Sequence, residues 1–276
     1  MPRSRAKRTK SQPHSKWLLD VVICVYDKFD LLTRCLDSIP DAAGDIAYRI
    51  IIVDNNSSDR DEFYTDLKTQ ITLIKNNENL GFITASNMGA KRGRAPLIFM
   101  LNSDVILDPG AIEKMVADFD EPDVGVVGMK LRFPEIAEHL HDPKTAGKIQ
   151  HVGLASNIQG EFYHLFIGWD VDHPKVTAVR GVLAVTGAAL MTRRSLWKEI
   201  DGFNPIYGLG CYEDVEYCLR IQTMKKLVMV EGEATGIHFT NATAREHDIG
   251  YPLQENNMIM KSRWKGHYPW SCWLHH

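Results

Sequence analysis

The sequence predicts an α/β protein built on a doubly wound, mostly parallel sheet with helices on both faces. Two observations carry this prediction. Strand and helix patterns alternate along the first 130 residues, and the strand segments are continuously apolar instead of alternating between apolar and polar residues. Continuous apolar strands are typical of parallel sheets that are buried on both faces. With 276 residues, the chain is long enough for one large or two modest domains.

The first strand is expected at residues 18–26 (LLDVVICVY), a buried run rich in β-branched residues. The second strand, 48–54, ends in Asp54, and either of the serines that follow, Ser57 or Ser58, is a suitable N-cap for the next helix. Between the two strands a helix is expected because apolar residues recur there at i, i+3, i+4 and i+7: Leu32, Cys35, Leu36 and Ile39.

The alternation continues with a third strand at 71–76, a helix of small residues at 81–93 and a fourth strand at 95–104. Asp108 and Pro109 then take the N-cap and the first position of another expected helix, because proline is favoured at the first helical position.

The second half of the chain has a weaker pattern. Residues 130–180 show no clear period and are expected to be irregular or mixed. A strand is expected at 182–194, followed by a short helix with Ser195 as its N-cap. A longer helix at 212–225 and a final strand at 226–232 come next, and the last forty residues are expected to fold back as a helix.

The first sixteen residues contain six basic residues and no acidic one. We expect a disordered basic tail, whose contact with phosphate or with a membrane surface the sequence leaves open. No apolar segment follows, so no secretory signal is expected, and no apolar run approaches the roughly 20 residues of a membrane helix. Five cysteines without a CxxC pair fit reduced thiols in a cytoplasmic protein.

Other function classes are disfavoured by what the sequence lacks. A formal charge of -3 argues against a protein that coats nucleic acid, because such binding needs a strongly basic face. The histidines never fall into a complete zinc-ligand spacing. There is no GxxxxGK[ST], and no GxGxxG follows the first strand, so a bound nucleotide would lack a glycine cradle and would need a metal to balance its charge.

Polar residues interrupt the apolar pattern where the predicted strands end. Asp54 ends one strand, and Asn102, Ser103 and Asp104 interrupt the run FMLNSDVIL. Residues two apart in an extended segment face the same way, so Asn102 and Asp104 would both point into the crevice at the carboxyl ends of the strands. Such oxygen ligands suit Mg²⁺ or Mn²⁺ shared with a diphosphate. A polar turn without function is the alternative.

The second half supplies further candidates. Glu213, Asp214 and Glu216 begin a predicted helix, where the helix dipole favours acids, so a solvated acidic N-terminus would also explain them. The glycine-rich segment before them would instead expose a carboxylate at a mobile rim. His238 follows the last expected strand and would be either structural or a metal ligand.

Six segments, in this order and spacing, resemble the family 2 inverting glycosyltransferases of the GT-A fold. The likeness spans about residues 18 to 265 and is closest to the branch with bacterial rhamnosyl and related transferases. It implies a single domain at 17–265, with a nucleotide-binding half at 17–130, an acceptor-binding half at 131–265 and a C-terminal tail at 266–276. The segments are VVICVYDKFDLLTRCLDSI, IIIVDNNSSD, NENLGFITASNMGA, LNSDVILDPGAI, VTGAALMTRRSLWKEIDGFNP and YEDVEYCLRI.

The resemblance also implies roles for individual residues. Asp104 matches the position that binds Mn²⁺ or Mg²⁺, and His238 matches a histidine that completes the metal site. Asp214 matches the catalytic base, with Glu213 beside it. The residues that match nucleotide-binding positions are Cys24, Val25, Tyr26, Asp54, Asn56, Asn87 and Ser103.

Two departures from the family pattern concern base recognition, because Cys24 replaces the usual proline and Asp27 the usual asparagine. The implied reaction is metal-assisted transfer of a sugar from a nucleotide-diphosphate sugar to a hydroxyl of a glycan, lipid-linked or protein acceptor. The segment from Gly202 to Tyr212 would close over the donor. No specific nucleic-acid partner is expected, and the sugar, the base, the acceptor and the oligomeric state stay open.

Two other functions compete with this one. A nucleotidyltransferase also uses a metal on an α/β fold, but it usually has a glycine-rich loop after the first strand, and CVYDKFD has no glycine. A catalytically silent module that only binds a nucleotide sugar or a glycan is the second alternative. The joint presence of Asp54, Asp104, Asp214 and His238 speaks against it.

Overall fold

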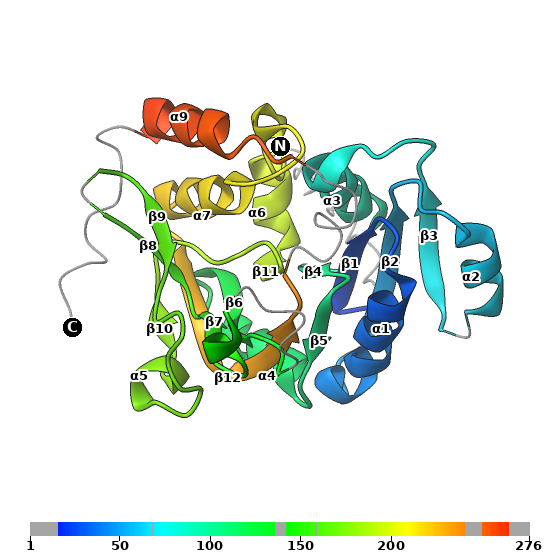
Figure 1. Ribbon diagram of the computed structural model, residues 1–276, viewed down its shortest axis with the longest axis horizontal. Helices are drawn as coiled ribbons and strands as arrows, with labels where there is room; N and C mark the ends of the chain where they lie inside the picture. Colours follow the sequence, from blue (N-terminus) through cyan, green and yellow to red (C-terminus); the bar gives the residue numbers. More distant parts are fainter. Residues whose placement is uncertain (1–15, 68, 136–141, 158, 241–249, 265–276) are drawn as a thin grey trace, which may run out of the picture.

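The computed structural model describes residues 16–67, 69–135, 142–157, 159–240 and 250–264. In this part of the chain, one ten-stranded mixed sheet runs through both halves and carries helices on both faces (Figure 1). The two expected tails, 1–16 and 266–276, lie outside the described residues apart from Lys16.

The first half follows the predicted alternation of strand and helix. β1 pairs in parallel with β2 and with β4, and β2 pairs in parallel with β3. The carboxyl ends of these strands therefore share one edge of the sheet. The elements are β1 Leu19–Val25, α1 Phe29–Ala43, β2 Tyr48–Asp54, α2 Arg60–Asp66, β3 Ile71–Lys75, α3 Gly81–Arg92 and β4 Leu97–Asn102.

The rest of the chain after β4 extends the same sheet with parallel and antiparallel pairs, and the strand order of the whole sheet is β10-β12-β6-β11-β4-β1-β2-β3, with β5 beside β12 and β7 beside β6. Its elements are β5 Val105–Leu107, α4 Ala111–Ala117, η1 Asp118–Asp120, β6 Val124–Arg132, η3 Pro143–Thr145, β7 Ile149–His151, β8 Leu154–Ser156, β9 Phe162–His164, α5 Pro174–Thr177, β10 Arg180–Gly181, β11 Ala189–Arg193, α6 Arg194–Glu199, η4 Pro205–Tyr207, α7 Glu213–Thr223, β12 Leu227–His238 and α9 Leu253–Trp264.

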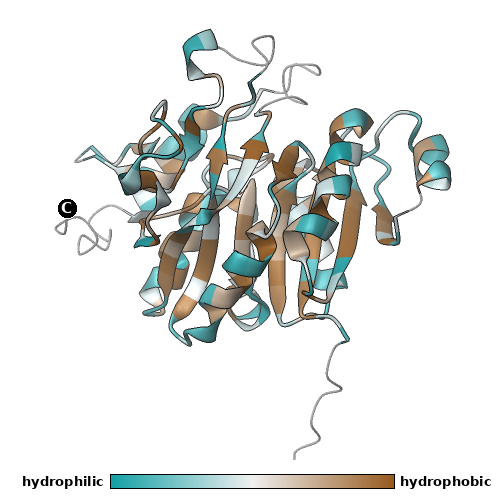
Figure 2. Ribbon diagram, turned by 90° about the horizontal axis from the view of Figure 1, so that it is seen from below, coloured by the Kyte–Doolittle hydropathy of each residue, from teal (hydrophilic) through white to brown (hydrophobic). Residues whose placement is uncertain are grey.

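Each face of the sheet has its own apolar core. Successive residues of a strand point to opposite faces, so Val21 and Ile23 of β1 pack in the core that includes α1 and α4, and Val22 packs in the core that includes α3, α6 and α7. Figure 2 shows the brown strands enclosed by helices with teal outer faces. This arrangement explains why the strands are continuously apolar in sequence.

The region after residue 120 contains more regular structure than the sequence predicts. β6 was not expected, because Gly125 and Gly128 weaken its strand pattern. At both positions a neighbouring side chain leaves no room for a Cβ atom. A Cβ at Gly128 would lie 2.6 Å from Val185 Cβ, and one at Gly125 would lie 2.8 Å from Ile221 Cγ2. The segment 130–180, expected to be irregular or mixed, contributes the short strands β7, β8 and β9.

Three of the predicted helix caps are wrong. Helix α4 begins after Gly110, and Asp108 instead accepts hydrogen bonds from the Arg132 guanidinium. Asp59 is the N-cap of α2, while Ser57 accepts the Asp27 N–H. Helix α6 starts at Arg194, which places Ser195 inside the helix. In the first two cases, the side chain predicted to cap the helix forms its hydrogen bonds with a residue that is distant in the sequence.

β5 and β12 bring two distant parts of the chain together at the edge where β4 ends. These strands pair antiparallel, with Val105 opposite His238. Asp104, directly before β5, therefore lies beside the end of β12. Among the described helices, none combines the length and the apolar character that a membrane crossing requires.

Candidate active site

A cavity of about 480 Å³ opens at the carboxyl end of β4, between the segment before β11, the start of α7 and the end of β12. It collects residues from both halves of the chain: Phe82, Asn102, Phe133, Gln150, His164, Ile167, Thr186, Gly187, Ala188, Gly210, Cys211, Glu213, Asp214, His238, Thr240 and Tyr251. Four residues that the sequence singles out thus line one cavity: Asn102, Glu213, Asp214 and His238.

His238, which lines this cavity, forms a close pair with Asp104, which is not in the lining. His238 Nε2 lies 3.3 Å from Asp104 Oδ1, and both side chains are about nine-tenths buried. Gln150 orients the imidazole from the side opposite Asp104. Its amide nitrogen donates to His238 O, and its Oε1 lies 2.7 Å from His238 Nδ1. The Gln150 oxygen can only accept, so Nδ1 carries a hydrogen and Nε2 is the ring nitrogen that faces Asp104.

This pair fits a divalent cation. An imidazole nitrogen and a carboxylate oxygen that face each other at 3.3 Å need a proton or a cation between them. Imidazole and carboxylate are both Mn²⁺ ligands, and the Gln150 contact is the outer hydrogen bond that typically orients a metal-binding histidine. Among the described residues, no group of three or more acidic, histidine or cysteine side chains forms a metal cage, so two protein ligands would leave positions for phosphate and water.

Asp214 is held in one orientation by backbone groups. Its Oδ2 accepts the Gly187 N–H at 2.8 Å, and its Oδ1 accepts the Val215 N–H at 2.8 Å. Burial raises the pKa of Asp214, while these N–H groups act in the opposite direction because they stabilise the carboxylate. The result is an oriented carboxylate in the wall of the cavity.

Glu213 has a different environment. It is 5% exposed, and its Oε2 has no hydrogen-bond partner among the residues that the structure describes. Burial, and after it the charge of Asp214, raise the pKa of Glu213 well above its ordinary value. Neighbouring carboxylates whose surroundings separate their pKa values take different protonation states. Burial raises the pKa of both acids, and Asp214 is the one whose carboxylate is stabilised by the Gly187 and Val215 N–H groups.

The three residues predicted at the end of β1 differ in their surroundings. The Cys24 thiol lies 3.4 Å from Ser86 Oγ, and burial raises its pKa to about 12, so it stays a neutral thiol. Val25 is 2% exposed and belongs to the core beside α1, and its carbonyl accepts the Asn55 N–H at 2.8 Å. Tyr26 follows directly and is half-buried. Their roles toward a nucleotide stay predictions.

Asp54 is fully buried and bound by protein groups. Its carboxylate accepts the Ser57 N–H at 2.8 Å and the Tyr64 hydroxyl at 2.9 Å, and it lies 3.6 Å from the Arg60 guanidinium. These contacts order the loop after β2. Asn56, in that loop, is exposed and has a positive φ of 72°. Contact of either residue with a nucleotide base remains a prediction.

Asn87 and Ser103 also lie outside the lining of the cavity. The Asn87 amide is engaged at both ends by the Phe203 backbone, donating to its O at 2.8 Å and accepting its N–H at 3.0 Å. This contact joins α3 to the segment before α7. Ser103 is buried, 8% exposed, between Asn102 and Asp104. Roles for these two residues in nucleotide binding stay predictions.

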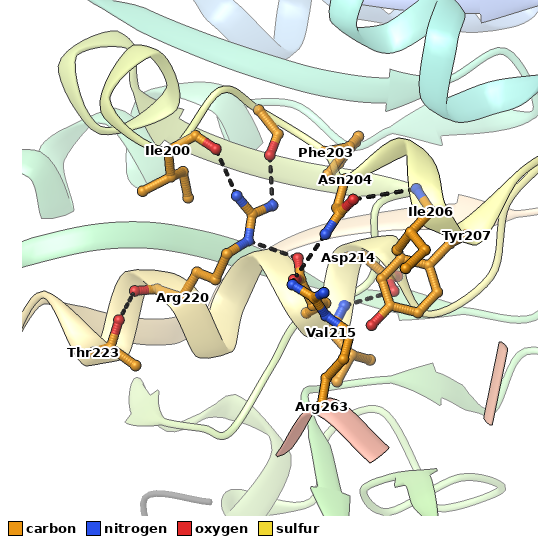
Figure 3. A network of polar contacts seen from close by, with 12 residues as sticks. Ile200, Phe203, Asn204, Ile206, Tyr207, Asp214, Val215, Arg220, Thr223 and Arg263 are labelled. Carbon is orange, nitrogen blue, oxygen red and sulfur yellow. Dashed lines mark hydrogen bonds and ion pairs between the residues drawn. The ribbon is translucent and has the colours of Figure 1, made fainter. Parts of the chain in front are cut away.

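The segment from Gly202 to Tyr212 is anchored from the side of α7. Glu216 is fully buried. Its Oε2 accepts a hydrogen bond from Arg220 Nε at 2.6 Å, and its Oε1 accepts from Asn204 Nδ2 at 3.3 Å and from Arg263 Nη2 of α9 at 3.4 Å. The Arg220 guanidinium also donates to the Ile200 and Gly202 carbonyls, so the start of the segment is fixed (Figure 3). Glu216 is therefore structural, unlike the two acids before it.

Helix α9 fixes the other end of the same segment. Asn256, 2% exposed, donates from Nδ2 to three carbonyls, those of Tyr207, Gly210 and Cys211, at 2.8 to 3.0 Å. The Leu209 carbonyl accepts the Phe82 N–H of α3 at 3.0 Å. The backbone that leads into Glu213 and Asp214 thus depends on a helix far along the chain.

Sequence reasoning missed several residues of the site. Gln150 and His164 lie in the region without a clear period, and Thr186 and Gly187 lie in a segment expected to be strand. Gly187 is the residue that donates to Asp214. A missed signal was the small-residue break TGAA inside the run 182–194, which marks a close backbone approach.

Comparisons with known sequences point to one family. A family model described as Glycosyl transferase family 2 matches residues 20–197. The O-antigen biosynthesis protein RfbC of Myxococcus xanthus is 26% identical over 243 residues, which are 84% of this chain and 18% of RfbC. An N-acetylglucosaminyltransferase of Bradyrhizobium elkanii is 30% identical over 117 residues, which are 39% of this chain and 62% of that protein. The chain spans about a fifth of the length of RfbC.

Solved structures agree in fold. The crystal structure of GalNAc-T7 with UDP, GalNAc and Mn²⁺ matches with a TM-score of 0.68 and 14% identity, over 91% of this chain and 49% of that one. The mannosyltransferase PcManGT from Pyrobaculum calidifontis, in complex with GDP-Man and Mn²⁺, matches with a TM-score of 0.54 and 15% identity, over 93% of this chain and 72% of that one. These likenesses confirm the predicted GT-A fold.

Proposed function

The chain belongs to glycosyl transferase family 2, and from this premise we propose that it transfers a sugar from a nucleotide-diphosphate sugar to an acceptor hydroxyl by a single displacement that inverts the anomeric carbon. Residues 17–130 would hold the nucleotide and residues 131–265 the acceptor. We also propose that, within the family, the chain is similar to the branch of bacterial rhamnosyl and related transferases.

One observation carries the proposal. Asp214 and His238 line the same cavity, and Asp104 lies 3.3 Å from His238. An ionised carboxylate and a cation site at one cavity are the two groups that an acceptor hydroxyl and a departing diphosphate need. A polar turn at Asn102–Asp104 or an acidic helix N-terminus would not require this convergence.

Asp214 would act as the general base. Its backbone contacts leave the carboxylate oriented at the cavity wall, where it takes the proton of the acceptor hydroxyl as that oxygen attacks the anomeric carbon. Asp104 and His238 would hold Mn²⁺ or Mg²⁺, and a cation there neutralises charge on the leaving diphosphate when bound. Protonated Glu213 adds no second negative charge beside the base.

The competing functions receive less support. A nucleotidyltransferase usually has a glycine-rich loop with a basic residue after its first strand, whereas the segment that follows β1 here, YDKFD, contains no glycine. A silent binding module has no need for a buried carboxylate held by two N–H groups and aimed at the cavity.

The test is turnover of nucleotide-diphosphate sugars. A thermal-shift screen with and without Mn²⁺ selects the donor, because a ligand that binds the native state raises the melting temperature. Release of nucleoside diphosphate is then measured with candidate glycan and lipid-linked acceptors, and the anomer of the product is read by NMR. A donor that binds and is never cleaved with any acceptor would favour the binding module, and a retained anomer would reject the single displacement.

A further inference from the structure

A pair of neutral histidines lies in the cavity wall formed by the second half of the chain. His151 ends β7 and His164 ends β9, and their Nδ1 atoms lie 2.9 Å apart. His151 is 1% exposed, whereas His164 is partly exposed and lines the cavity that also holds Asp214. None of the groups described above for the proposed reaction uses this pair.

The hydrogen bonds fix the tautomer of His151. Its Nε2 accepts two backbone N–H groups, those of Gly153 and Thr186, each at 3.3 Å. An imidazole nitrogen that accepts carries no hydrogen, so the proton of neutral His151 lies on Nδ1. The ring is neutral because burial lowers the pKa of His151 well below its ordinary value.

The tautomer of His164 follows from that of His151. The Nδ1–H of His151 donates to His164 Nδ1 at 2.9 Å, so His164 accepts at Nδ1 and carries its own hydrogen on Nε2. Burial, and after it the charge of His238, lower the pKa of His164 to about 4, so the ring stays neutral near pH 7. Backbone amides therefore set, through two rings, which nitrogen of His164 is a donor.

We infer that His164 presents its Nε2–H to the cavity as a fixed, uncharged hydrogen-bond donor that binds a hydroxyl oxygen of the sugar substrates. This inference rests on the proposed function and adds a specificity residue to it. A neutral N–H suits a sugar hydroxyl, and the locked tautomer excludes a ligand that offers only a donor at this point. Thr186 couples the pair to the base, since it donates to His151 and precedes Gly187, which donates to Asp214.

The hydroxyl belongs either to the donor sugar or to the acceptor, and kinetics separate the two. His164→Phe removes the donor and keeps a ring, while His164→Gln places an amide N–H near the original Nε2. His164→Phe is expected to raise the KM of one substrate about tenfold, because one hydrogen bond is lost. His164→Gln should recover most of that loss. The substrate whose KM rises identifies the source of the hydroxyl.

A neighbouring residue provides the matched control. Tyr163 precedes His164 on β9, is 47% exposed and points to the opposite face of the strand. Tyr163→Phe removes a hydroxyl from the same strand and should leave both KM values unchanged. If His164→Phe leaves both KM values at the wild-type level, the inference is overturned.

A measurement without turnover keeps this test independent of the proposed function. In full-length protein labelled with ¹⁵N-histidine, long-range proton–nitrogen spectra report which ring nitrogen carries hydrogen. We expect hydrogen on Nδ1 of His151 and on Nε2 of His164, and the reverse assignment for His164 would overturn the inference. A wild-type protein that turns over no nucleotide sugar would count against the proposed function and leave the tautomer result unaffected.

Discussion

His238 Nε2 lies 3.3 Å from Asp104 Oδ1, although the two residues come from opposite halves of the chain. The register of β5 against β12 produces this contact, because Val105 pairs with His238 and Asp104 precedes Val105. The Phe239 N–H also donates to Asp104 O at 3.0 Å. Backbone pairing thus sets the separation of the two proposed metal ligands, independently of any bound ion.

Gln150 should control metal affinity without touching the metal. Gln150→Leu frees the imidazole of His238 to rotate and to change tautomer, because the 2.7 Å contact with Nδ1 is lost. We expect about 10- to 100-fold weaker Mn²⁺ affinity, measured by calorimetry in the presence of nucleoside diphosphate. Gln159→Leu, at an exposed position, is the control. Unchanged affinity in Gln150→Leu would reject His238 as a ligand.

Asp214→Asn should abolish transfer while the donor still binds. The amide cannot take a proton from the acceptor, and general-base catalysis typically contributes 10² to 10⁴-fold. Wild-type kcat/KM should fall as the pH drops through the pKa of Asp214, which burial raises above the ordinary aspartate value, since only the ionised form is a base. The measurement is kcat/KM against pH, with Asp201→Asn as an exposed control. Near-normal turnover by Asp214→Asn would remove Asp214 from this role.

Glu213 should make the protein less stable as the pH rises. The pKa of native Glu213 lies well above that of the unfolded chain, so between the two values the native state holds one proton more. Stability present at low pH is then lost by about 1.4 kcal/mol per pH unit from roughly pH 5 upward. Urea unfolding from pH 5 to 8 should show a flatter dependence for Glu213→Gln than for wild type. The same slope in both would contradict a protonated Glu213; Glu62→Gln is the exposed control.

Glu216→Gln should destabilise the fold. The variant removes the buried carboxylate that Arg220 and Arg263 share, and breaking a buried ion pair typically costs about 3 to 5 kcal/mol. Because the Arg220 guanidinium is partly exposed, we expect the lower end, about 3 kcal/mol, in the free energy of unfolding. Glu255→Gln, on the outside of α9, should change it little. A loss below about 1 kcal/mol would show that Arg220 is held by the carbonyls alone.

Asn256→Leu should loosen α9 and the segment before α7 together. Three carbonyls lose this donor, although the Tyr207 carbonyl keeps the Gly210 N–H at 3.4 Å, and each carbonyl left unpaired in a buried site costs about 1 to 3 kcal/mol. Hydrogen exchange should rise in α9 and in residues 207–212, compared with the exposed control Gln254→Leu. Faster exchange in α9 alone would mean that the segment is held mainly by Glu216 and Asn87.

Much of the fold was predictable because each rule involved depends only on nearby sequence. β1, β2 and β4 are continuously apolar, and the faces of α1 and α7 repeat at helical spacing, so their positions follow from pattern. The position of β6 could not be predicted in this way, because Gly125 and Gly128 are needed for close packing against Ile221 and Val185, which lie far away in the sequence. The N-cap predicted at Asp108 was wrong for the same reason, since the Asp108 carboxylate accepts a hydrogen bond from Arg132, which is distant in sequence.

In the candidate site, too, residues that form a local sequence pattern could be predicted, and residues that depend on distant partners could not. Asp104 stood out as a polar break in a strand, and the acids at 213 and 214 as the start of a helix, but their proximity to His238 came from the family resemblance alone. Gln150, His151 and His164 gave no pattern, because each matters through a partner distant in sequence. Asp54 shows the converse, since a carboxylate at a strand end is here bound by its own loop.

The three hydrogen bonds from Asn256 also affect the order in which the protein is built. The ribosome completes the nucleotide-binding strands and the backbone before Asp214 well before it adds α9, the element that holds that backbone in place. Domains begin to fold from the N-terminal side during synthesis. A growing chain can therefore assemble the proposed donor site early, and the proposed base takes its final position only when translation has passed residue 264.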